Sequence, residues 1–396
     1  FIMEKTPLAM RKHVTIFGNT NVGKSTLFNS LLGQEIAIVS EVEGTTTDPV
    51  IKAWELIPYG PIALIDTAGL SDESQLGQMR IKKTMNVLKR TDLILHVLDA
   101  ESAAGTEIAQ VDKSIPEILV LTKCDETDEA TLSALKDKYP DAVFLFGYKD
   151  DDLRPLRVKM IDELDKQDRD DETMIGKFLP KGSSLILVCP IDSEAPKGRL
   201  ILPQVQLIRD CLDHNMKAYV TTEHTLLEAL EELKKVDLVV TDSQAFKLVD
   251  SIVPKEIPLT SFSMLLACQK SDFETLIAGA GAVDKLTADS KILMLEGCTH
   301  NTSHEDIGRV KIPRLIKKYT GYDLEFKYYT GYNFPEDLSG YSLCIQCGMC
   351  MVNKKEIQSR LDAAKKAGLP VTNYGMVLAK LNGILDRAKE IFYQEV

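Results

Sequence analysis

The chain has 396 residues, of which 44% are hydrophobic and 27% are charged, and its net charge is −12. This length predicts two or three domains, and the acidic balance argues against a large electrostatic contact with DNA or RNA. No apolar run is long enough to cross a bilayer, and the first residues lack the apolar core of a signal peptide. We therefore expect a cytoplasmic protein with neither nucleic-acid nor membrane partners.

The first part of the chain alternates between buried strands and helices. Strands are expected in "HVTIFG", "IALIDT", "DLILHVLD", "EILVLTK" and "AVFLFG", and helices in "KSTLFNSLLG" and "MRIKKTMNVLKR". This alternation is typical of a mostly parallel sheet with helices on both faces. The polar stretch "DKQDRDDET" then predicts a linker near residues 166–174.

The stretch "GNTNVGKS" (18–25) follows the first expected strand and opens the first expected helix, which is the context of a P-loop. In such a loop backbone N–H groups hold phosphate oxygens, while Lys24 reaches the β and γ phosphates and Ser25 holds Mg²⁺. A chance glycine-rich turn is a poor explanation, because the pattern fixes four positions. The loop residues expected at the nucleotide are Asn19, Asn21, Val22, Gly23, Lys24, Ser25 and Thr26.

Three further motifs follow in the order that a GTPase requires, namely "GTTTDP" (44–49), "DTAG" (66–69) and "TKCD" (122–125). The first offers a threonine for Mg²⁺ and the γ-phosphate. In the second, Asp66 is placed to hold Mg²⁺ through water, and Gly69 to sense the γ-phosphate. In the third, Lys123 and Asp125 are expected at the base, because the Asp125 carboxylate accepts two hydrogen bonds that guanine donates and adenine cannot.

Residues 11–150 resemble the Era and tRNA-modification branch of the GTPases. The resemblance implies that Thr46 is the Mg²⁺ ligand of the "GTTTDP" motif and that Asn21 helps to hold a potassium ion beside the phosphates. The expected catalytic residues are then Lys24, Thr46, Asp66 and Gly69, and Ser25 and Thr46 are the expected Mg²⁺ ligands.

The chain departs from that branch at several positions. Thr122 stands where the branch has an asparagine, which predicts looser guanine binding, and "FGYKD" near residue 147 takes the place of the last guanine motif. Leu70 follows "DTAG", where many GTPases carry a glutamine that orients water. We therefore expect hydrolysis to be slow, or to depend on a cation, a partner or another residue, for which Gln78 is a candidate.

Two more α/β alternations follow the linker, and they start at "SSLILVCP" and "KILMLEGC". The predicted fold is an α/β chain of three domains. A P-loop GTPase domain with a mostly parallel sheet (1–168) precedes two smaller α/β domains, for dimerisation (175–262) and for cluster binding (263–396). Small sheets with open edges are readily completed by a second copy, so the middle domain predicts a homodimer.

Three of the eight cysteines fall within the seven residues of "CIQCGMC" (344–350). Without a secretory signal, disulfides are the poorer explanation. Cys347 and Cys350 form a CxxC pair, which alone fits a redox pair, a zinc half-site or two unrelated thiols. Cys298 ends an expected strand in "GCTHNTSHE". Together the three thiols favour zinc or an iron–sulfur cluster.

The whole chain resembles the family of FeFe-hydrogenase maturation GTPases, HydF, whose cluster pattern is C-x-H, a long spacer and H-C-x-x-C. Cys298, His300, Cys347 and Cys350 match this pattern, whereas Gln346 replaces the second histidine. The resemblance implies a 4Fe–4S cluster on the three cysteines. It also implies a scaffold that carries the precursor of a di-iron subsite to apo FeFe-hydrogenase, with two radical-SAM maturases as further partners.

The fourth cluster ligand is expected to be exchangeable. We favour Glu305, then His304, while His300, Cys344 and water stay open as alternatives. The alternative explanation of Glu305 is that its negative charge favours the N-terminus of the helix expected to begin near Asp306. If Cys344 instead closes a four-cysteine cluster, the chain is better explained as a GTP-regulated redox protein. A GTPase acting on RNA or the ribosome is the third hypothesis, and the acidic charge argues against it.

Overall fold

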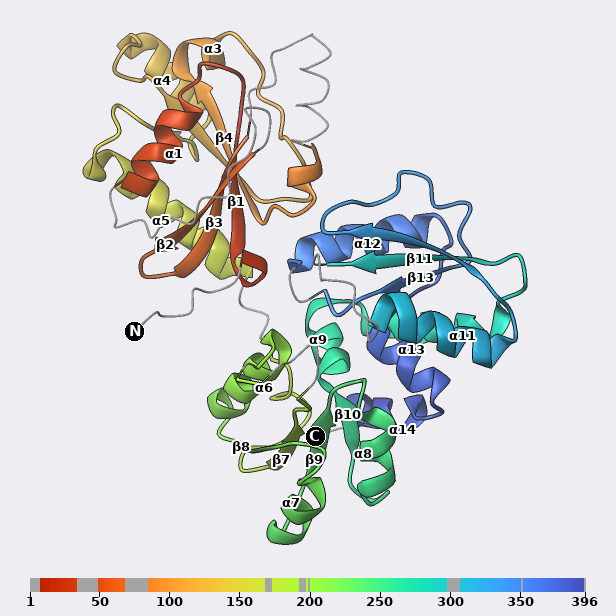
Figure 1. The fold of residues 1–396 in the computed structure, drawn as a ribbon. Helices are drawn as coiled ribbons and strands as arrows, with labels where there is room; N and C mark the ends of the chain where they lie inside the picture. The colour runs from red at the N-terminus through yellow and green to blue at the C-terminus, as the bar shows by residue number, and fades with distance from the viewer. Residues whose placement is uncertain are drawn as a thin grey trace. The chain divides into compact units, whose positions relative to one another are not determined.

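The computed structural model describes residues 8–33, 49–67, 85–167, 173–191, 197–198, 200–297, 307–349 and 352–394. The chain divides into two compact units, Phe1–Asp171 and Glu172–Val396, and each is treated by itself below (Figure 1).

The first unit holds a six-stranded sheet in the order β2-β3-β1-β4-β5-β6, in which every neighbouring pair is parallel except β2 with β3. Its elements are η1 (Leu8–Met10), β1 (Lys12–Phe17), α1 (Lys24–Gly33), β2 (Val50–Leu56), β3 (Gly60–Asp66), β4 (Leu93–Asp99), α3 (Ala100–Ala104), β5 (Glu117–Thr122), α4 (Glu129–Lys138), β6 (Val143–Phe144) and α5 (Asp150–Gln167). The mostly parallel sheet predicted from the sequence is confirmed. The antiparallel strand β2 was not anticipated.

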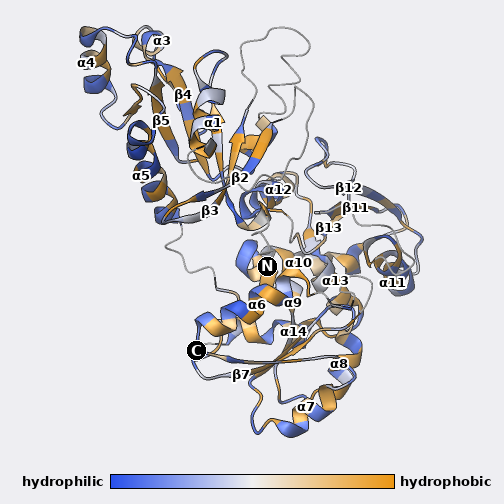
Figure 2. Cartoon of the chain, turned by 60° about the vertical axis from the view of Figure 1, so that its left-hand side comes forward, coloured by the Kyte–Doolittle hydropathy of each residue, from blue (hydrophilic) through white to orange (hydrophobic). Residues whose placement is uncertain are grey.

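Helices cover both faces of this sheet because its strands are apolar on both sides. Leu27 and Leu31 of α1 pack in one core with Leu153 and Leu156 of α5. The helices α3 and α4 contribute to a separate core with Leu121 on the opposite face. In Figure 2 the strands β4 and β5 are coloured largely as hydrophobic, whereas much of α5 is coloured as hydrophilic.

Two predicted segments of the first unit differ from the structure or fall partly outside it. The predicted linker begins later than residue 166, because α5 continues through Gln167 and its last turns bury Leu164. Of the helix predicted in "MRIKKTMNVLKR", only the end is described, and residues 85–88 are helical.

The second unit contains two four-stranded parallel sheets, in the orders β10-β9-β7-β8 and β12-β11-β13-β14. The first sheet and its helices comprise β7 (Ser184–Val188), α6 (Leu202–Asp213), β8 (Lys217–Thr221), α7 (Leu226–Glu232), β9 (Leu238–Thr241), α8 (Phe246–Ile252), β10 (Leu259–Ser261), α9 (Phe262–Lys270), α10 (Phe273–Gly281) and η2 (Ala282–Lys285). The second comprises β11 (Lys291–Glu296), a π-helical turn η3 (Ile307–Lys311), α11 (Ile312–Thr320), β12 (Glu325–Thr330), β13 (Leu343–Gln346), α12 (Lys354–Lys366), β14 (Val371–Asn373), α13 (Tyr374–Leu381), α14 (Leu385–Lys389) and η4 (Glu390–Tyr393).

The last predicted helix, "LAKLNGILDRAKEIF", is wrong as a single element. The chain forms α13 and α14 instead, and it breaks at Gly383, whose φ of 73° lies in the left-handed region that glycine adopts readily. The strands β12 and β13 were not anticipated either. Across the residues that the structure describes, no helix has both the length and the apolar character needed to cross a membrane.

Candidate nucleotide site and metal centre

The phosphate-binding loop joins β1 to α1, as the sequence predicts. A side chain at Gly18 would clash, because its Cβ would lie 2.2 Å from the Val97 carbonyl oxygen. Asn21 and Gly23 have φ values of 63° and 88°, which turn the loop back toward the helix. The loop therefore presents backbone N–H groups at the N-terminus of α1, where phosphate oxygens bind.

Two of the residues expected to hold Mg²⁺, Ser25 and Asp66, lie at this loop. Asp66 ends β3, which pairs with β1, and its Oδ2 accepts a hydrogen bond of 2.9 Å from the Ser25 hydroxyl. Its Oδ1 is buried without a hydrogen-bond partner. An unpaired buried carboxylate oxygen beside a serine hydroxyl fits a hard cation such as Mg²⁺. Thr46 and Gly69 lie outside the described residues, as do Leu70 and Gln78.

Lys24 is buried and Asp66 is half-buried, and their opposite charges interact. The Lys24 amino group donates to the Asn19 carbonyl within the loop. Burial lowers the pKa of Lys24, and the negative charge of Asp66 opposes that effect. Burial likewise raises the pKa of Asp66, against the hydrogen bond from Ser25 and the charge of Lys24. A bound phosphate would place negative charge beside Lys24, and a divalent cation would place positive charge beside Asp66. Both would replace the solvation that these two groups lose on burial.

The base-recognition motif is tied to the phosphate-binding loop through Thr122. This residue ends β5 and is fully buried, and its hydroxyl contacts the Val22 carbonyl at 2.7 Å and the Leu98 carbonyl at 3.2 Å. The threonine therefore connects the two motifs, although the sequence predicted only a loosened site. Lys123 follows with a φ of 55°, and Asp125, two residues further on, lies exposed in a turn.

Tyr148 is a site residue that the sequence analysis did not identify. A Cβ on Gly23 would lie 2.5 Å from its hydroxyl, so the phenol sits directly on the phosphate-binding loop. The Tyr148 hydroxyl also hydrogen-bonds Thr122, while burial raises the pKa of the phenol. Its position in "FGYKD", at the expected place of the last guanine motif, was the available signal.

The predicted metal centre lies at the carboxyl ends of β11 and β13. These strands are neighbours, and β11 is followed in the chain by β12 on its other side. The strand order therefore reverses between β11 and β13, where ligands of open α/β sheets usually bind. Cys298 is the second residue after β11, and Cys347 follows β13 directly. Cys298, Cys350, His300, His304 and Glu305 lie outside the described residues.

The Cys347 sulfur is the best-defined ligand position. It accepts hydrogen bonds from the backbone N–H of Gly297 at 3.0 Å and of Met349 at 3.3 Å. Such backbone donors stabilise a cluster thiolate. Gly297 is the residue before Cys298 in the sequence. A larger residue at Gly297 would crowd Val352 and Met349, at 3.1 and 3.3 Å from its Cβ.

Cys344 lies away from this sulfur, inside β13. Its backbone is paired with Leu293 and Val371, and its side chain is 2% exposed in the apolar core. Cys347 is three residue steps further along the chain, which is about 10 Å between Cα atoms in a strand. Burial raises the pKa of the Cys344 thiol to about 12. These surroundings are those of a structural thiol rather than of a cluster ligand.

Gln346 precedes Cys347 and is 3% exposed. Its Oε1 is buried without a hydrogen-bond partner. The Cys347 sulfur, its backbone donors and its position at a strand end together fit a cysteine-bound cluster, since thiolates select iron–sulfur clusters or zinc. Of the three expected cysteine ligands, Cys347 is the one that lies among the described residues.

The first unit is a P-loop GTPase domain: residues 13–123 match the family model described as 50S ribosome-binding GTPase. Residues 174–271 match the hydrogen maturase F dimerization domain, and residues 274–391 match the hydrogen maturase F tetramerization domain. The chain belongs to the hydrogen maturase F family.

The curated relatives each match less than half of the chain. The tRNA modification GTPase MnmE of Chromobacterium violaceum is 32% identical over 171 residues, which are 42% of this chain and 37% of that protein. MnmE of Burkholderia thailandensis is 38% identical over 120 residues, or 29% of this chain and 26% of that protein. The chain thus spans about a third of the length of the curated relatives it matches.

Two solved structures resemble the GTPase unit in sequence. Era in complex with MgGDPNP and a 16S ribosomal RNA fragment is 26% identical, with a TM-score of 0.30, and covers 38% of this chain and 56% of its own. The G domain of the T. maritima iron transporter FeoB is 25% identical, with a TM-score of 0.30, and covers 39% of this chain and 99% of its own.

Proposed function

We propose that the chain is a GTP-hydrolysing scaffold that binds a 4Fe–4S cluster and assembles or delivers the di-iron subsite precursor to apo FeFe-hydrogenase. The observation that carries the proposal is the Cys347 sulfur at the end of β13, which accepts hydrogen bonds from the backbone N–H groups of Gly297 and Met349. Two radical-SAM maturases are the proposed upstream partners, and the cytoplasm is the proposed compartment. The family membership supports the same role.

In this proposal Cys298, Cys347 and Cys350 hold the cluster, and an exchangeable donor completes it. Glu305 is the favoured donor, before His304. A cluster held in this way supplies an iron with a displaceable ligand. In this proposal the backbone N–H groups of Gly297 and Met349 hold the Cys347 sulfur in place by hydrogen bonds. The apolar core packs beneath this site.

The position of Cys344 argues against the alternative of a redox protein with four cysteine ligands. A fourth thiolate would close the cluster, and the buried, strand-paired Cys344 is poorly placed to provide it. For an RNA- or ribosome-associated GTPase, the support is confined to the first unit, because the other two matched models describe hydrogen maturase domains.

Transfer of the precursor is tested by reconstituting the chain anaerobically with iron and sulfide and incubating it with the two maturases and apo-hydrogenase. We expect hydrogenase activity to appear with the wild type and with Cys344→Ala, and to be lost with Cys347→Ser. Activation of equal extent by Cys347→Ser, or in the absence of the chain, would contradict the scaffold role. Iron content of each variant, measured before mixing, separates a failed transfer from a lost cluster.

We propose that potassium stimulates the slow, Mg²⁺-dependent hydrolysis through Asn21. This residue holds a left-handed backbone conformation in the phosphate-binding loop, next to the expected phosphates. Replacing K⁺ by Na⁺ at constant ionic strength is expected to slow GTP turnover several-fold. The Asn21→Ala variant should turn over at similar rates in both salts. Equal wild-type rates in K⁺ and Na⁺ would remove the potassium site without affecting the GTPase assignment.

The middle domain is proposed to form a homodimer through β8. This strand is the outermost of its sheet, and Tyr219 and Val220 are 38% and 45% exposed along it. An exposed edge with apolar side chains readily pairs with another strand. The matched dimerization model covers the same residues. A Tyr219→Cys variant that resists bismaleimide cross-linking between chains would contradict this edge.

A further inference from the structure

The base-recognition motif of the GTPase unit departs from the branch it resembles at Thr122, where that branch carries an asparagine. The sequence alone predicted looser guanine binding from this change. In the structure Thr122 is fully buried at the end of β5, and its hydroxyl is in contact with other parts of the nucleotide site. These contacts indicate what the chain uses in place of the asparagine.

The Thr122 hydroxyl has one proton and two neighbouring carbonyl acceptors. The Val22 carbonyl lies at 2.7 Å and the Leu98 carbonyl at 3.2 Å, so the proton is directed mainly to Val22. The Thr122 oxygen then has a lone pair left for a donor, and the Tyr148 hydroxyl hydrogen-bonds it. The resulting chain of hydrogen bonds runs from Tyr148 through Thr122 to Val22.

This chain of hydrogen bonds needs a neutral phenol, because a phenolate has no proton to donate. Burial raises the pKa of Tyr148, and the negative charge of Asp125 raises it further. The phenol therefore keeps its proton throughout the neutral pH range. The half-buried ring also packs against the apolar core that contains Val22, Leu27 and Leu153. The donor is thus fixed both in its protonation and in its position.

The hydrogen bond to Val22 orients the peptide unit that joins Val22 to Gly23. In a planar trans peptide the carbonyl and the N–H group point in opposite directions. Because Thr122 binds the Val22 carbonyl, the Gly23 N–H is directed away from Thr122. Gly23 immediately precedes Lys24, the first residue of α1. An N–H group held in this way at a helix N-terminus is available to a phosphate oxygen.

The phenol also fills the space in which a side chain at position 23 would lie. A Cβ on Gly23 would lie 2.5 Å from the Tyr148 hydroxyl oxygen and 3.7 Å from the Thr122 hydroxyl oxygen. The two hydroxyls are therefore packed together against the phosphate-binding loop. A side chain longer than threonine at position 122 would meet the phenol.

The loop that carries Tyr148 is joined to the base-recognition motif by backbone hydrogen bonds as well. The Leu145 N–H donates to the Leu121 carbonyl at 2.8 Å, and the Cys124 N–H donates to the Leu145 carbonyl at 3.2 Å. These bonds lie on either side of Thr122 in the sequence. The phenol therefore belongs to the same hydrogen-bonded frame as the turn that carries Asp125.

A purely structural role is the alternative explanation of Tyr148, because a buried tyrosine hydroxyl usually finds a hydrogen-bond partner. Tyr139 is such a case in the same unit. Its hydroxyl accepts a hydrogen bond of 3.3 Å from the Ile108 N–H, in the core on the opposite face of the sheet from α1. Tyr148 differs because its partner, Thr122, holds the phosphate-binding loop. The two tyrosines therefore provide a matched pair for an experiment.

We propose that Tyr148 is a positioning residue of the nucleotide site, and that Tyr148 and Thr122 together replace the asparagine of the related GTPases. The phenol donates to Thr122, Thr122 donates to Val22, and the Gly23 N–H is thereby held toward the phosphates. The threonine at position 122 is then a working part of the site, and it does not by itself loosen nucleotide binding.

The first test removes the hydroxyl and keeps the ring, as Tyr148→Phe in the full chain. We expect the dissociation constant of a fluorescent GDP analogue to rise about three- to tenfold, which is the effect of one neutral hydrogen bond. The matched control, Tyr139→Phe, should bind the analogue like the wild type. Thermal unfolding of both variants without nucleotide measures any effect on the fold.

Inosine diphosphate lacks the exocyclic amino group of guanine, so it separates the phosphate-binding loop from base recognition. Because the phenol acts on the loop, Tyr148→Phe should weaken GDP and inosine diphosphate by the same factor in competition with the fluorescent analogue. A loss confined to GDP would place the effect at Asp125 and would contradict the positioning of Gly23.

The second test examines the pairing with Thr122→Asn, alone and combined with Tyr148→Ala. Asparagine is the usual residue of the branch, but here its longer side chain meets the phenol and displaces the packed loop. Thr122→Asn alone should therefore bind the GDP analogue about tenfold more weakly than the wild type. Removing the phenol makes room for the amide, so the double variant should bind more tightly than Thr122→Asn. Such non-additivity is expected for residues in direct contact.

Three results would overturn the proposal. If Tyr148→Phe binds GDP as tightly as the wild type, the hydroxyl does not position the loop, and a lower unfolding temperature would then assign it a structural role only. If Thr122→Asn alone binds as tightly as the wild type, the phenol does not exclude asparagine. If the double variant binds no more tightly than Thr122→Asn, the two residues do not act as a pair. The cluster site belongs to the other unit, so the proposed scaffold function is independent of all three results.

Discussion

Replacing Lys24 with alanine is expected to lower GTP turnover by about 10²–10³-fold, the usual cost of removing one preorganised donor from a charged transition state. Lys24 is the first residue of α1, is 6% exposed as a whole, and lies within electrostatic reach of Asp66. It is therefore already largely desolvated before the nucleotide binds. Its positive charge then interacts strongly with the negative charge that develops on the transferred phosphoryl group. Phosphate release under saturating GTP and Mg²⁺ measures the effect.

The matched control is Lys113→Ala, a lysine on an exposed loop of the same unit, which should keep wild-type turnover. Binding of a fluorescent GDP analogue by both variants separates a loss of catalysis from a loss of folding. Wild-type turnover in Lys24→Ala would contradict the assignment of the nucleotide site. It would not affect the cluster site, because the two belong to different units.

The GTPase unit was largely predictable because its motifs combine local sequence with a fixed place in the fold. The glycines and Lys24 could be placed from the sequence, since a P-loop always joins a strand to a helix. The role of Thr122 could not, because its hydrogen bond to Val22 joins the end of β5 to the phosphate-binding loop, which is distant in sequence. Tyr148 was missed for the same reason, and β2 because its burial depends on pairing with β3.

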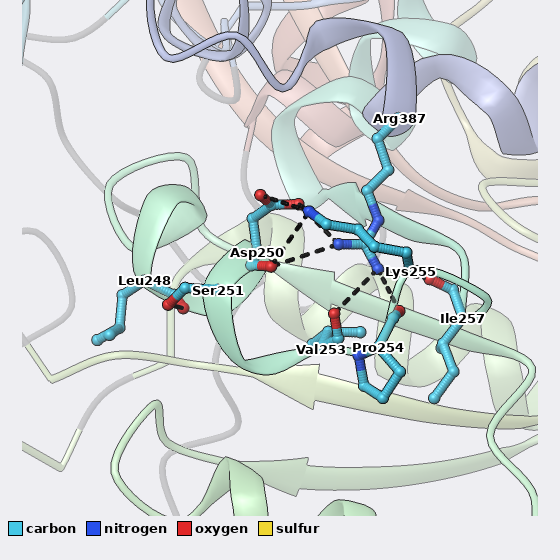
Figure 3. A network of polar contacts seen from close by, with 8 residues as sticks. All are labelled: Leu248, Asp250, Ser251, Val253, Pro254, Lys255, Ile257 and Arg387. Carbon is cyan, nitrogen blue, oxygen red and sulfur yellow. Dashed lines mark hydrogen bonds and ion pairs between the residues drawn. The ribbon is translucent and has the colours of Figure 1, made fainter.

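The second unit was less predictable because most of its order comes from tertiary contacts. The strand β12, "EFKYYT", has no apolar run, and β13 has only four residues. The break at Gly383 sends α14 back to β10, and Arg387 of α14 donates a hydrogen bond of 2.6 Å to the Asp250 carboxylate (Figure 3). A fragment of residues 175–262 would therefore lack Arg387, and self-association is best measured on the full chain.

In the cluster site, too, residue spacing predicted some features and only the fold revealed others. The CxxC pair and Cys298 were recognisable from the sequence, but nothing local indicated that Cys347 and Gly297 are in hydrogen-bond contact. The strand pairing of β11 with β13 supplies that contact. The same pairing shows why Cys344, only three residues away, faces the apolar core instead.

Changing Cys347 to serine is therefore expected to remove most of the iron bound after anaerobic reconstitution, from about four iron atoms per chain for a 4Fe–4S cluster to less than about one. Serine keeps the size of the side chain but is a much weaker ligand for cluster iron than thiolate. The same loss is expected for Cys298→Ser and Cys350→Ser. Iron and sulfide analysis, with the visible absorption of the cluster, measures it.

Cys344→Ala is the matched control, since it removes a thiol three residues away in the same strand and should retain the iron. Some loss of stability is expected, because the Cys344 side chain is buried in the apolar core. Glu305→Ala should retain the cluster while changing its EPR spectrum or its response to added imidazole or cyanide. If Cys344→Ala loses the iron and the wild-type cluster ignores added ligands, four cysteines close the site. The open iron position that a scaffold needs would then be missing, and the redox function would become the better explanation.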